Sequence, residues 1–295
     1  MFIGLWICFC LSKISSFIFT KLTSNQISKK SSADFARFLI INGLCACAFF
    51  LVSGKFQIHL NSVTLLFAFI YAVIVFASLL LNVISFRLIE ISNLNVIRNT
   101  GSMLINLAVG FFLFSEAVTF KNILRIVLMC VATFLIFLGK KGKSGEVKKG
   151  TGILVLGVIA VLSTVSIAAS TITLKYFSIV PNTKDTNSLF FLTNAIMVVG
   201  ALFYMPLLPK RSESTDKAER FTLTKLLIFL GNTVSSNVGS LLSALLIAKI
   251  DISIYSPLST AFAILCGISA SLIFKEKLKL FDWLAVLIAA LTIAI

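Results

Sequence analysis

FFLFSEAVTFKNILRIVLMCVATFLIF (residues 111–137) and SLIFKEKLKLFDWLAVLIAALTIAI (residues 271–295) follow one pattern. In each stretch an apolar segment ends in aromatic residues, and a glutamate, a short polar turn and a second apolar segment follow. The glutamates are Glu116 and Glu276, one in each half of the chain. This recurrence predicts that the chain is a duplicated set of apolar helices.

The composition is that of a membrane protein. Hydrophobic residues make up 58% of the 295 residues, and the mean hydropathy is +1.04, more than a soluble core could bury. A helix needs roughly 20 apolar residues to cross a bilayer, and the runs here are too continuous for barrel strands. We therefore expect an all-α polytopic membrane protein with ten transmembrane helices, at residues 2–20, 33–53, 62–86, 96–114, 121–139, 152–178, 187–208, 222–247, 256–274 and 280–295. The first run carries Lys13 and has no small-residue cleavage site, so we interpret it as a retained helix.

The chain divides into two halves, residues 1–140 and 150–295, joined by the basic linker KKGKSGEVKKG at residues 140–150. Each half has five predicted helices. An odd number of crossings makes the second half start on the opposite face of the membrane, which predicts two inverted five-helix repeats. Transporters with inverted repeats bind their solute near the bilayer midplane, where the repeats meet.

The net charge of +15 lies mainly in the connections between the predicted helices. Such cations are typical of topology signals and of contacts with anionic lipid headgroups, so we expect the lipid bilayer and no nucleic acid as a partner. The lysine-rich connections follow helices 1, 5, 7 and 9. The positive-inside rule predicts that these connections are cytoplasmic and that both termini are outside.

The two halves share a longer motif, LIEIS (residues 88–92) leading to Glu116 and IAKIDIS (residues 247–253) leading to Glu276. In this motif the chain resembles the EamA-like transporters of the drug/metabolite transporter superfamily, which have two five-helix repeats. The resemblance implies a secondary carrier for amino acids, nucleotide sugars, other metabolites or toxic compounds.

The chain departs from that family at three points. The family usually has glycine nine residues after each glutamate, where this chain has Arg125 and Ala285. Pro257 has no counterpart in the first half, near residues 97–98. Well-known members also have both termini in the cytoplasm, opposite to the loop charges of this chain.

Few charged residues lie within the predicted spans, and at bilayer depth such residues usually face a cavity or a partner. Lys13 is in the middle of the first helix, where it could contact an anionic solute, pair with a carboxylate or extend to the interface. Arg37, Arg98 and Arg125 lie closer to helix ends and are interpreted as interface anchors. Glu116 and Glu276 are interpreted as structural turn residues that face the N-terminus of the following helix, rather than as proton carriers.

Small polar residues recur at helical spacing in two predicted helices. One set is Ser163, Ser166, Ser170 and Thr173, and the other is Asn232, Ser235 or Ser236, Gly239 and Ser243. Such faces line a solute pathway or support close helix packing. Asn106 and Asn194 could add hydrogen bonds, as could Ser259 and Thr260. The candidate pathway residues are Lys13, Asn82, Ser163, Ser166, Ser170, Asn232, Ser236 and Tyr255.

Catalytic motifs are missing from the sequence. The only histidine is His59, which excludes a histidine-based metal site and a Ser-His-Asp triad. The six cysteines lie in apolar runs without CxxC spacing, so no disulfide framework is expected. We therefore expect no enzymatic activity, no cofactor and no metal.

The sequence thus predicts a multi-pass protein of the plasma membrane that moves a small metabolite by alternating access, as an exporter or exchanger. An amino acid or an anionic solute is the first expectation. The alternatives are a multidrug efflux carrier and, in a different class, a membrane scaffold that transports nothing. A homodimer is compatible with the sequence.

Overall fold

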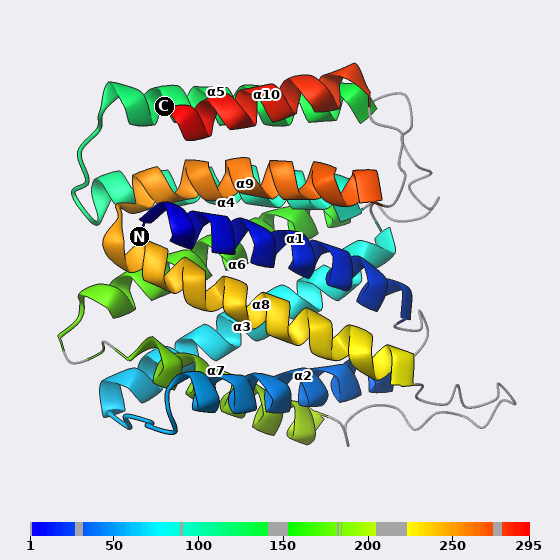
Figure 1. Ribbon diagram of the computed structural model, residues 1–295, viewed down its shortest axis with the longest axis vertical. Coiled ribbons are helices and arrows are strands. Elements are labelled where there is room, and N and C mark those ends of the chain that lie inside the picture. Colours follow the sequence, from blue (N-terminus) through cyan, green and yellow to red (C-terminus); the bar gives the residue numbers. More distant parts are fainter. Residues whose placement is uncertain are drawn as a thin grey trace, which may run out of the picture. The chain divides into compact units, whose positions relative to one another are not determined.

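The computed structural model describes residues 2–26, 32–88, 91–140, 153–181, 183, 185–204, 223–273 and 279–295. These residues form α-helices and no strand (Figure 1), which confirms the all-α prediction. The ten helices are α1 (Phe2–Gln26), α2 (Ser32–Ser53), α3 (Ser62–Leu88), α4 (Ile91–Phe112), α5 (Phe120–Lys140), α6 (Ile153–Ile179), α7 (Thr186–Tyr204), α8 (Leu223–Lys249), α9 (Ile252–Ile273) and α10 (Leu280–Ala294).

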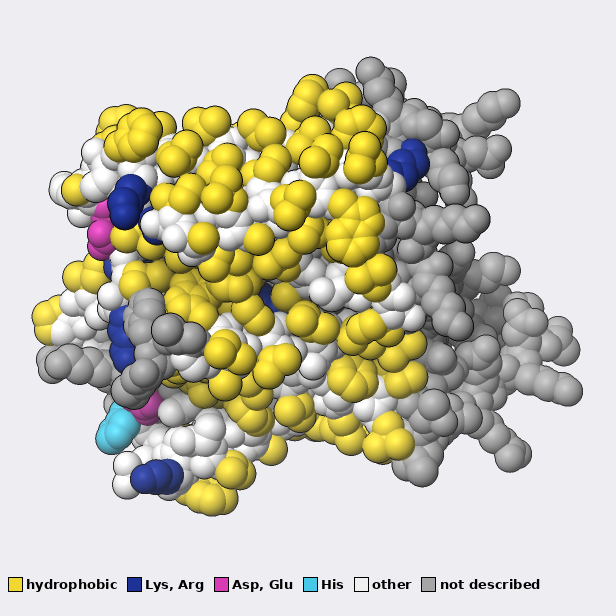
Figure 2. Space-filling view, turned by 45° about the horizontal axis from the view of Figure 1, so that its top comes forward, with side chains coloured by type: hydrophobic (Ala, Val, Ile, Leu, Met, Phe, Trp, Pro, Cys, Tyr) yellow, Lys and Arg dark blue, Asp and Glu magenta, His cyan; other side chains and the backbone are white. Residues whose placement is uncertain are grey.

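Five stretches of helix in the described residues are long and apolar enough to cross a membrane. They are Ser62–Leu81, Gly157–Ile179, Thr186–Phe203, Leu226–Lys249 and Ile252–Ser269. Large apolar side chains are exposed along these helices, and Figure 2 shows hydrophobic side chains spread over the visible face. Exposed apolar surface of this extent is typical of a protein that contacts lipid.

Two helices begin earlier than the sequence predicts. The predicted starts were residues 96 and 256, whereas α4 begins at Ile91 and α9 at Ile252. Only Ile250 and Asp251 separate α8 from α9. The sequence prediction placed these charged motifs in loops. In the structure, the side chains of Glu116 and Lys175 bond to backbone groups at the α8–α9 corner, so α9 extends into the motif.

The helices form two compact units, and each unit draws on both halves of the sequence. Unit 1 comprises Met1–Cys10, Val73–Val180 and Ser243–Ile295, and unit 2 comprises Leu11–Ala72 and Pro181–Leu242. The predicted sequence repeats are therefore interleaved within the compact units.

In unit 2, α2 and α7 lie side by side and run antiparallel (Figure 1). Gly43 faces Val198 at one end of the contact, and the rings of Phe50 and Phe190 stack 5.0 Å apart at the other. A Cβ on Gly43 would collide with Val198, so glycine is needed for this close approach. In the same way, Gly239 of α8 lies against Ser12 of α1.

In unit 1, α5 packs against α10, and α4 packs against both α6 and α9. The apolar core includes Met103, Leu107, Met129, Ile264 and Ala285. Ala285 is fully buried, so a small residue also serves close packing at this position of α10. Arg125 is half-buried, and its Nη1 donates to Asn122 Oδ1 at 3.2 Å.

The carboxylate of Glu116 caps the N-terminus of α9. Its Oε1 accepts from the N–H of Ile252 at 2.7 Å, and its Oε2 accepts from the N–H of Ser253 at 2.8 Å. The sequence interpretation of Glu116 as a structural residue agrees with this contact, but the helix differs, because α5 is the following helix and α9 belongs to the other half of the sequence. Glu276 lies outside the described residues.

The other side of the same corner is held by a lysine. Lys175 of α6 donates from Nζ to the carbonyl of Ile247 at 3.2 Å and to that of Ile250 at 2.8 Å. The last carbonyls of a helix have no partner within the helix and carry partial negative charge, so a cation stabilises them. The α8–α9 corner therefore has a cation at the end of one helix and an anion at the start of the next.

We expect Glu116→Ala to destabilise the protein by about 1.5–3 kcal/mol, because two N–H groups at the start of α9 lose a charged acceptor. The free energy of unfolding in mixed micelles measures this change. Asp251→Asn is the matched control, since Asp251 is exposed at the same corner. Equal stability of Glu116→Ala and the control would contradict the capping role.

A second substitution tests the same contact from α4. A Cβ on Gly110 would lie 2.7 Å from Glu116 Oε2, so Gly110→Ala should displace the carboxylate from α9. We expect Gly110→Ala to destabilise the native chain and to cost little in the Glu116→Ala background, with a coupling energy of about 1 kcal/mol or more. A double-mutant cycle on unfolding measures it, and equal costs in the two backgrounds would refute the contact.

Candidate functional site

One face of α4 is polar although it is buried within unit 1. Arg98, Ser102 and Asn106 follow each other at four-residue steps and are 4%, 5% and 3% exposed. Side chains four residues apart lie on the same face of a helix, and Gly110 continues this face toward Glu116. Because buried polar groups cost free energy unless they are bonded, such a face indicates a structural network or a binding site.

α9 presents a matching polar face. Ser253, Ser256 and Thr260 are buried and recur at three- and four-residue steps. Gly110 lies beside Ser253, and Thr260 Oγ1 donates to the carbonyl of Asn99 at 3.5 Å. The two contacts show that α4 and α9 run antiparallel. Asn106 and Ser256 fall between these contacts, at corresponding levels of the two helices.

Five buried polar atoms of unit 1 have no hydrogen-bond partner among the described residues. Two are the guanidinium nitrogens Arg98 Nε and Arg125 Nε, and the other three are Asn106 Oδ1 on α4, Ser163 Oγ on α6 and Ser256 Oγ on α9. Helix α4 packs against both α6 and α9. Native proteins leave few buried polar atoms unsatisfied, so each needs an explanation. An amide oxygen and two hydroxyls can bind a solute through hydrogen bonds. We define these three residues as the candidate site.

Several polar residues around the candidate site are hydrogen-bonded. The hydroxyls of Thr100 and Thr133 lie 2.6 Å apart and join α4 to α5. Ser102 Oγ donates to the carbonyl of Asn99 at 2.9 Å, and Asn122 Nδ2 donates to Ser253 Oγ at 3.4 Å. In the described part of unit 1, atoms without partners therefore occur beside bonded ones, at the candidate site and at Arg98 Nε and Arg125 Nε.

An aromatic cluster covers α9 on the side of α1. The Trp6 ring stacks on Phe262 at 5.0 Å and on Tyr255 at 6.3 Å between centroids. Tyr255 is buried and hydrogen-bonds to Ser243 and Ser259. Tyr255 was predicted as a pathway residue, and the structure places it in unit 1 on the helix that carries Ser256.

The predicted serine face of α6 divides into two groups. Ser163 is fully buried and has no partner for its hydroxyl. Ser166 and Ser170 are half-buried and donate to the carbonyls of Leu162 and Ile167 on their own helix. Thr173 likewise donates to Ala169. Of this predicted face, Ser163 alone enters the candidate site.

The remaining predicted residues belong to unit 2 or lack a described side chain. Lys13 on α1 and Asn232 on α8 are half-buried, and Ser236 is exposed. The side chains of Asn82 and Arg37 lie outside the described residues. Lys13, Asn232 and Ser236 belong to unit 2, and their role in a pathway stays a prediction.

Arg98 differs from its prediction as an interface anchor. Its side chain is 4% exposed, because α4 begins earlier than expected and packs between α6 and α9. Ser102 and Ser256 were not singled out in the sequence. The spacing of Arg98, Ser102 and Asn106 in α4 is the signal that could have found the polar face.

In the described part of the chain, no group of three or more His, Cys, Asp or Glu side chains could hold a metal ion.

No protein-family model and no curated protein matches the sequence. A solved crystal structure of a protein does match the fold, with a TM-score of 0.66 and 12% sequence identity. The fold is known. The match covers 97% of this chain and 94% of that chain, so the similarity extends over the full arrangement of helices. At this identity it describes the fold alone.

The candidate site predicts an unusual response of stability to substitution. Asn106→Leu should leave the free energy of unfolding unchanged or raise it by up to about 3 kcal/mol, because a buried side chain whose Oδ1 has no partner among the described residues is replaced by an apolar group of similar size. Thr100→Val, the matched control on the same helix, should lower it by about 1 kcal/mol through loss of the bond to Thr133. Equal destabilisation by the two variants, measured in mixed micelles, would show that Asn106 is structurally bonded.

Proposed function

We propose that the protein is a multi-pass membrane transporter, located in the plasma membrane, that moves a small metabolite by secondary-active alternating access. The observation that carries this proposal is the candidate site, where Asn106, Ser163 and Ser256 hold unsatisfied polar atoms among apolar helices. A static helical scaffold gains nothing from such atoms, because apolar residues of the same size would be more stable. A carrier needs them, since they supply hydrogen bonds to its solute.

The pairing of helices supports the proposed inverted duplication. α2 packs with α7, α4 with α9, and α5 with α10, so each pair joins helices at the same position of the two sequence halves. The pairs α2–α7 and α4–α9 run antiparallel, as equivalent helices do when the repeats have opposite orientations. This pairing also supports the resemblance to the EamA-like transporters, which remains part of the proposal.

A second pair of contacts follows the same relation. In unit 1, α6 runs parallel to α4, because Thr164 lies against Gly101 and Tyr176 against Phe114. α1 runs parallel to α9, because Trp6 lies against Tyr255 and Cys266 Sγ donates to the carbonyl of Cys10. In the two sequence halves, α4 corresponds to α9 and α6 corresponds to α1. The α4–α6 pair is therefore equivalent to the α9–α1 pair. A duplicated carrier would have such a relation.

The charges within the helices favour an anionic solute. Lys13 and Arg98 lie well inside α1 and α4, whereas the four carboxylates with described side chains lie in connections or at helix starts. Those four are Glu116, Asp185, Asp251 and Asp282. Positive charge inside the spans stabilises a carboxylate or phosphate group and opposes the passage of cations. We therefore propose a carboxylate- or phosphate-bearing metabolite as the substrate.

Reconstitution in liposomes tests the proposal. Labelled amino acids, organic acids, phosphorylated metabolites and a cationic dye should be compared under imposed proton and counter-solute gradients. We expect uptake of an anionic solute above protein-free vesicles, reduced severalfold by Lys13→Ala and by Asn106→Leu. Lys121→Ala is the control, since Lys121 is exposed at the start of α5.

Each outcome has a defined meaning. Transport of anions that is unchanged by Lys13→Ala would remove Lys13 from the pathway. Transport of the cationic dye alone would favour a multidrug carrier. Failure of every solute class, with folded protein in the vesicles, would overturn the transporter and favour a membrane scaffold.

A further inference from the structure

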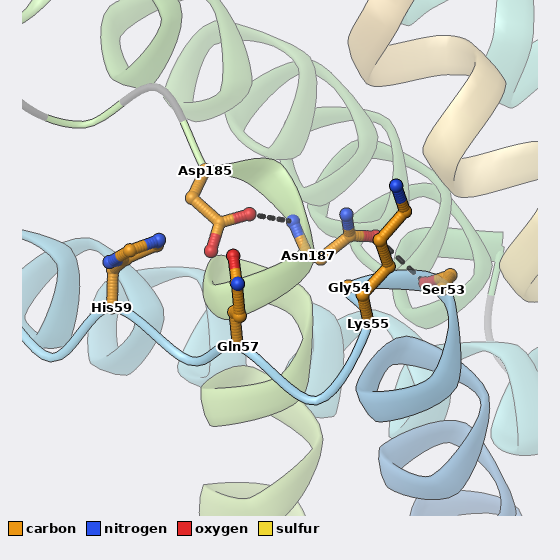
Figure 3. Close-up of a pocket in the computed structure, with 7 residues that line it drawn as sticks. All are labelled: Ser53, Gly54, Lys55, Gln57, His59, Asp185 and Asn187. Atoms are coloured by element: carbon orange, nitrogen blue, oxygen red, sulfur yellow. Dashed lines mark hydrogen bonds between the residues drawn. The ribbon is translucent and has the colours of Figure 1, made fainter.

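A pocket of about 580 Å³ lies at one end of unit 2 (Figure 3). It forms where the connection between α2 and α3 meets the start of α7. Its lining residues are Ser53, Gly54, Lys55, Gln57, His59, Asp185 and Asn187. The volume falls within the roughly 300–1,000 Å³ of pockets that bind small molecules.

The backbone around the pocket is held in a defined shape. Lys55 and Phe56 adopt left-handed conformations with φ of 54° and 59°, which are unfavourable for residues other than glycine. The N–H groups of Gly54 and Phe56 donate to the carbonyls of Phe50 and Leu51 and close the turn after α2. A Cβ on Gly54 would lie 3.3 Å from Asn187 Cβ, so glycine lets the turn approach α7.

The acceptor atoms of Asp185 and Asn187 already have partners within the protein. Asp185 Oδ1 accepts from the N–H of Asn187 at 3.1 Å, and Asp185 Oδ2 accepts from the hydroxyl of Ser188. The same hydroxyl accepts from the N–H of His59 at 2.8 Å. Ser53 Oγ donates to Asn187 Oδ1 at 2.8 Å. Asn187 therefore retains only its Nδ2 hydrogens for a ligand.

Beside the carboxylate of Asp185, the lining offers several donors. Lys55 carries a positive charge, Asn187 offers Nδ2, and His59 and Gln57 can each donate one or more hydrogen bonds. Figure 3 shows Lys55 and Gln57 rising from the connection toward the side where Asp185 and Asn187 lie. A surplus of donors with a lysine matches an oxyanion, which is a strong acceptor.

We propose that this pocket binds an oxyanion group, a carboxylate or a phosphate, through Lys55, His59 and Asn187. The group belongs either to a small soluble metabolite or to a lipid headgroup, because both present the same chemistry at the end of a membrane helix. The proposal concerns binding and is independent of the proposed transport function.

His59 makes the test direct, because it is the only histidine of the chain. The full-length protein, purified without a histidine tag and labelled with ¹³C and ¹⁵N in histidine, gives one imidazole signal from the pocket. In one arm, phosphate and succinate are added at constant ionic strength to protein in phosphatidylcholine nanodiscs, with chloride as the reference. In the other arm, phosphatidylglycerol replaces part of the phosphatidylcholine.

We expect the His59 signal to shift in a saturable manner in one of the two arms. Binding in the first arm assigns the pocket to a soluble anion, and a response in the second alone assigns it to a lipid headgroup. Lys55→Gln should weaken the binding about threefold to tenfold, as expected for loss of one charged hydrogen bond at an exposed site. Lys121→Gln, outside the pocket, should leave the binding unchanged.

Asn187→Asp is the sharpest variant, because it keeps the shape and the acceptor for Ser53 but replaces the Nδ2 donor with a second carboxylate oxygen. It should abolish the shift while the melting temperature stays close to that of the native protein. Absence of a saturable shift in both arms would overturn the proposal. Full binding by both Lys55→Gln and Asn187→Asp would overturn it equally.

Discussion

The start of α9 depends on the carboxylate of Glu116, which accepts from the N–H groups of Ile252 and Ser253. Because Lys175 binds the last carbonyls of α8, the chain can turn between the two helices in only two residues. This corner sets where α9 begins and therefore which of its residues face α4. The polar face of Ser253, Ser256 and Thr260 is positioned by the same contact. Two separate charges, Glu116 at the start of α9 and Lys175 at the end of α8, thus help to fix how the residues of α9 align with those of α4.

The candidate site and the pocket of unit 2 differ in their chemistry. Asn106, Ser163 and Ser256 are buried and lack partners among the described residues, so they are suited to a solute that enters the protein. Lys55 and His59 are exposed at a helix end, where they meet water or lipid headgroups first. The two proposed sites therefore differ in how they would recognise a ligand. The buried site would recognise it by hydrogen bonding in an apolar environment, and the exposed site would recognise it by charge.

Much of the fold was predictable from the sequence, because apolar runs of helical length are a strong signal. The helices of the described residues lie where the hydropathy placed them, with ends displaced by a few residues. The cap that Glu116 forms agrees with its interpretation as a structural residue, but the helix that it caps could not be predicted. Glu116 and Ile252 are distant in the sequence, and local helix-dipole reasoning finds only the next helix. Ser163 was found by its spacing, whereas Ser256 was missed because the register between α4 and α9 is a tertiary property.

Access of water-borne reagents to Ser256 tests the central claim, that the buried polar face of unit 1 is part of a solute pathway. In a cysteine-free background, Ser256→Cys is treated in sealed vesicles with a membrane-impermeant anionic thiosulfonate. Met103→Cys, in the fully buried apolar core of the same unit, is the control. We predict that Ser256→Cys is modified and Met103→Cys is not. If both cysteines stay unmodified from either side of the membrane, the polar face is closed to solutes and is no part of a pathway.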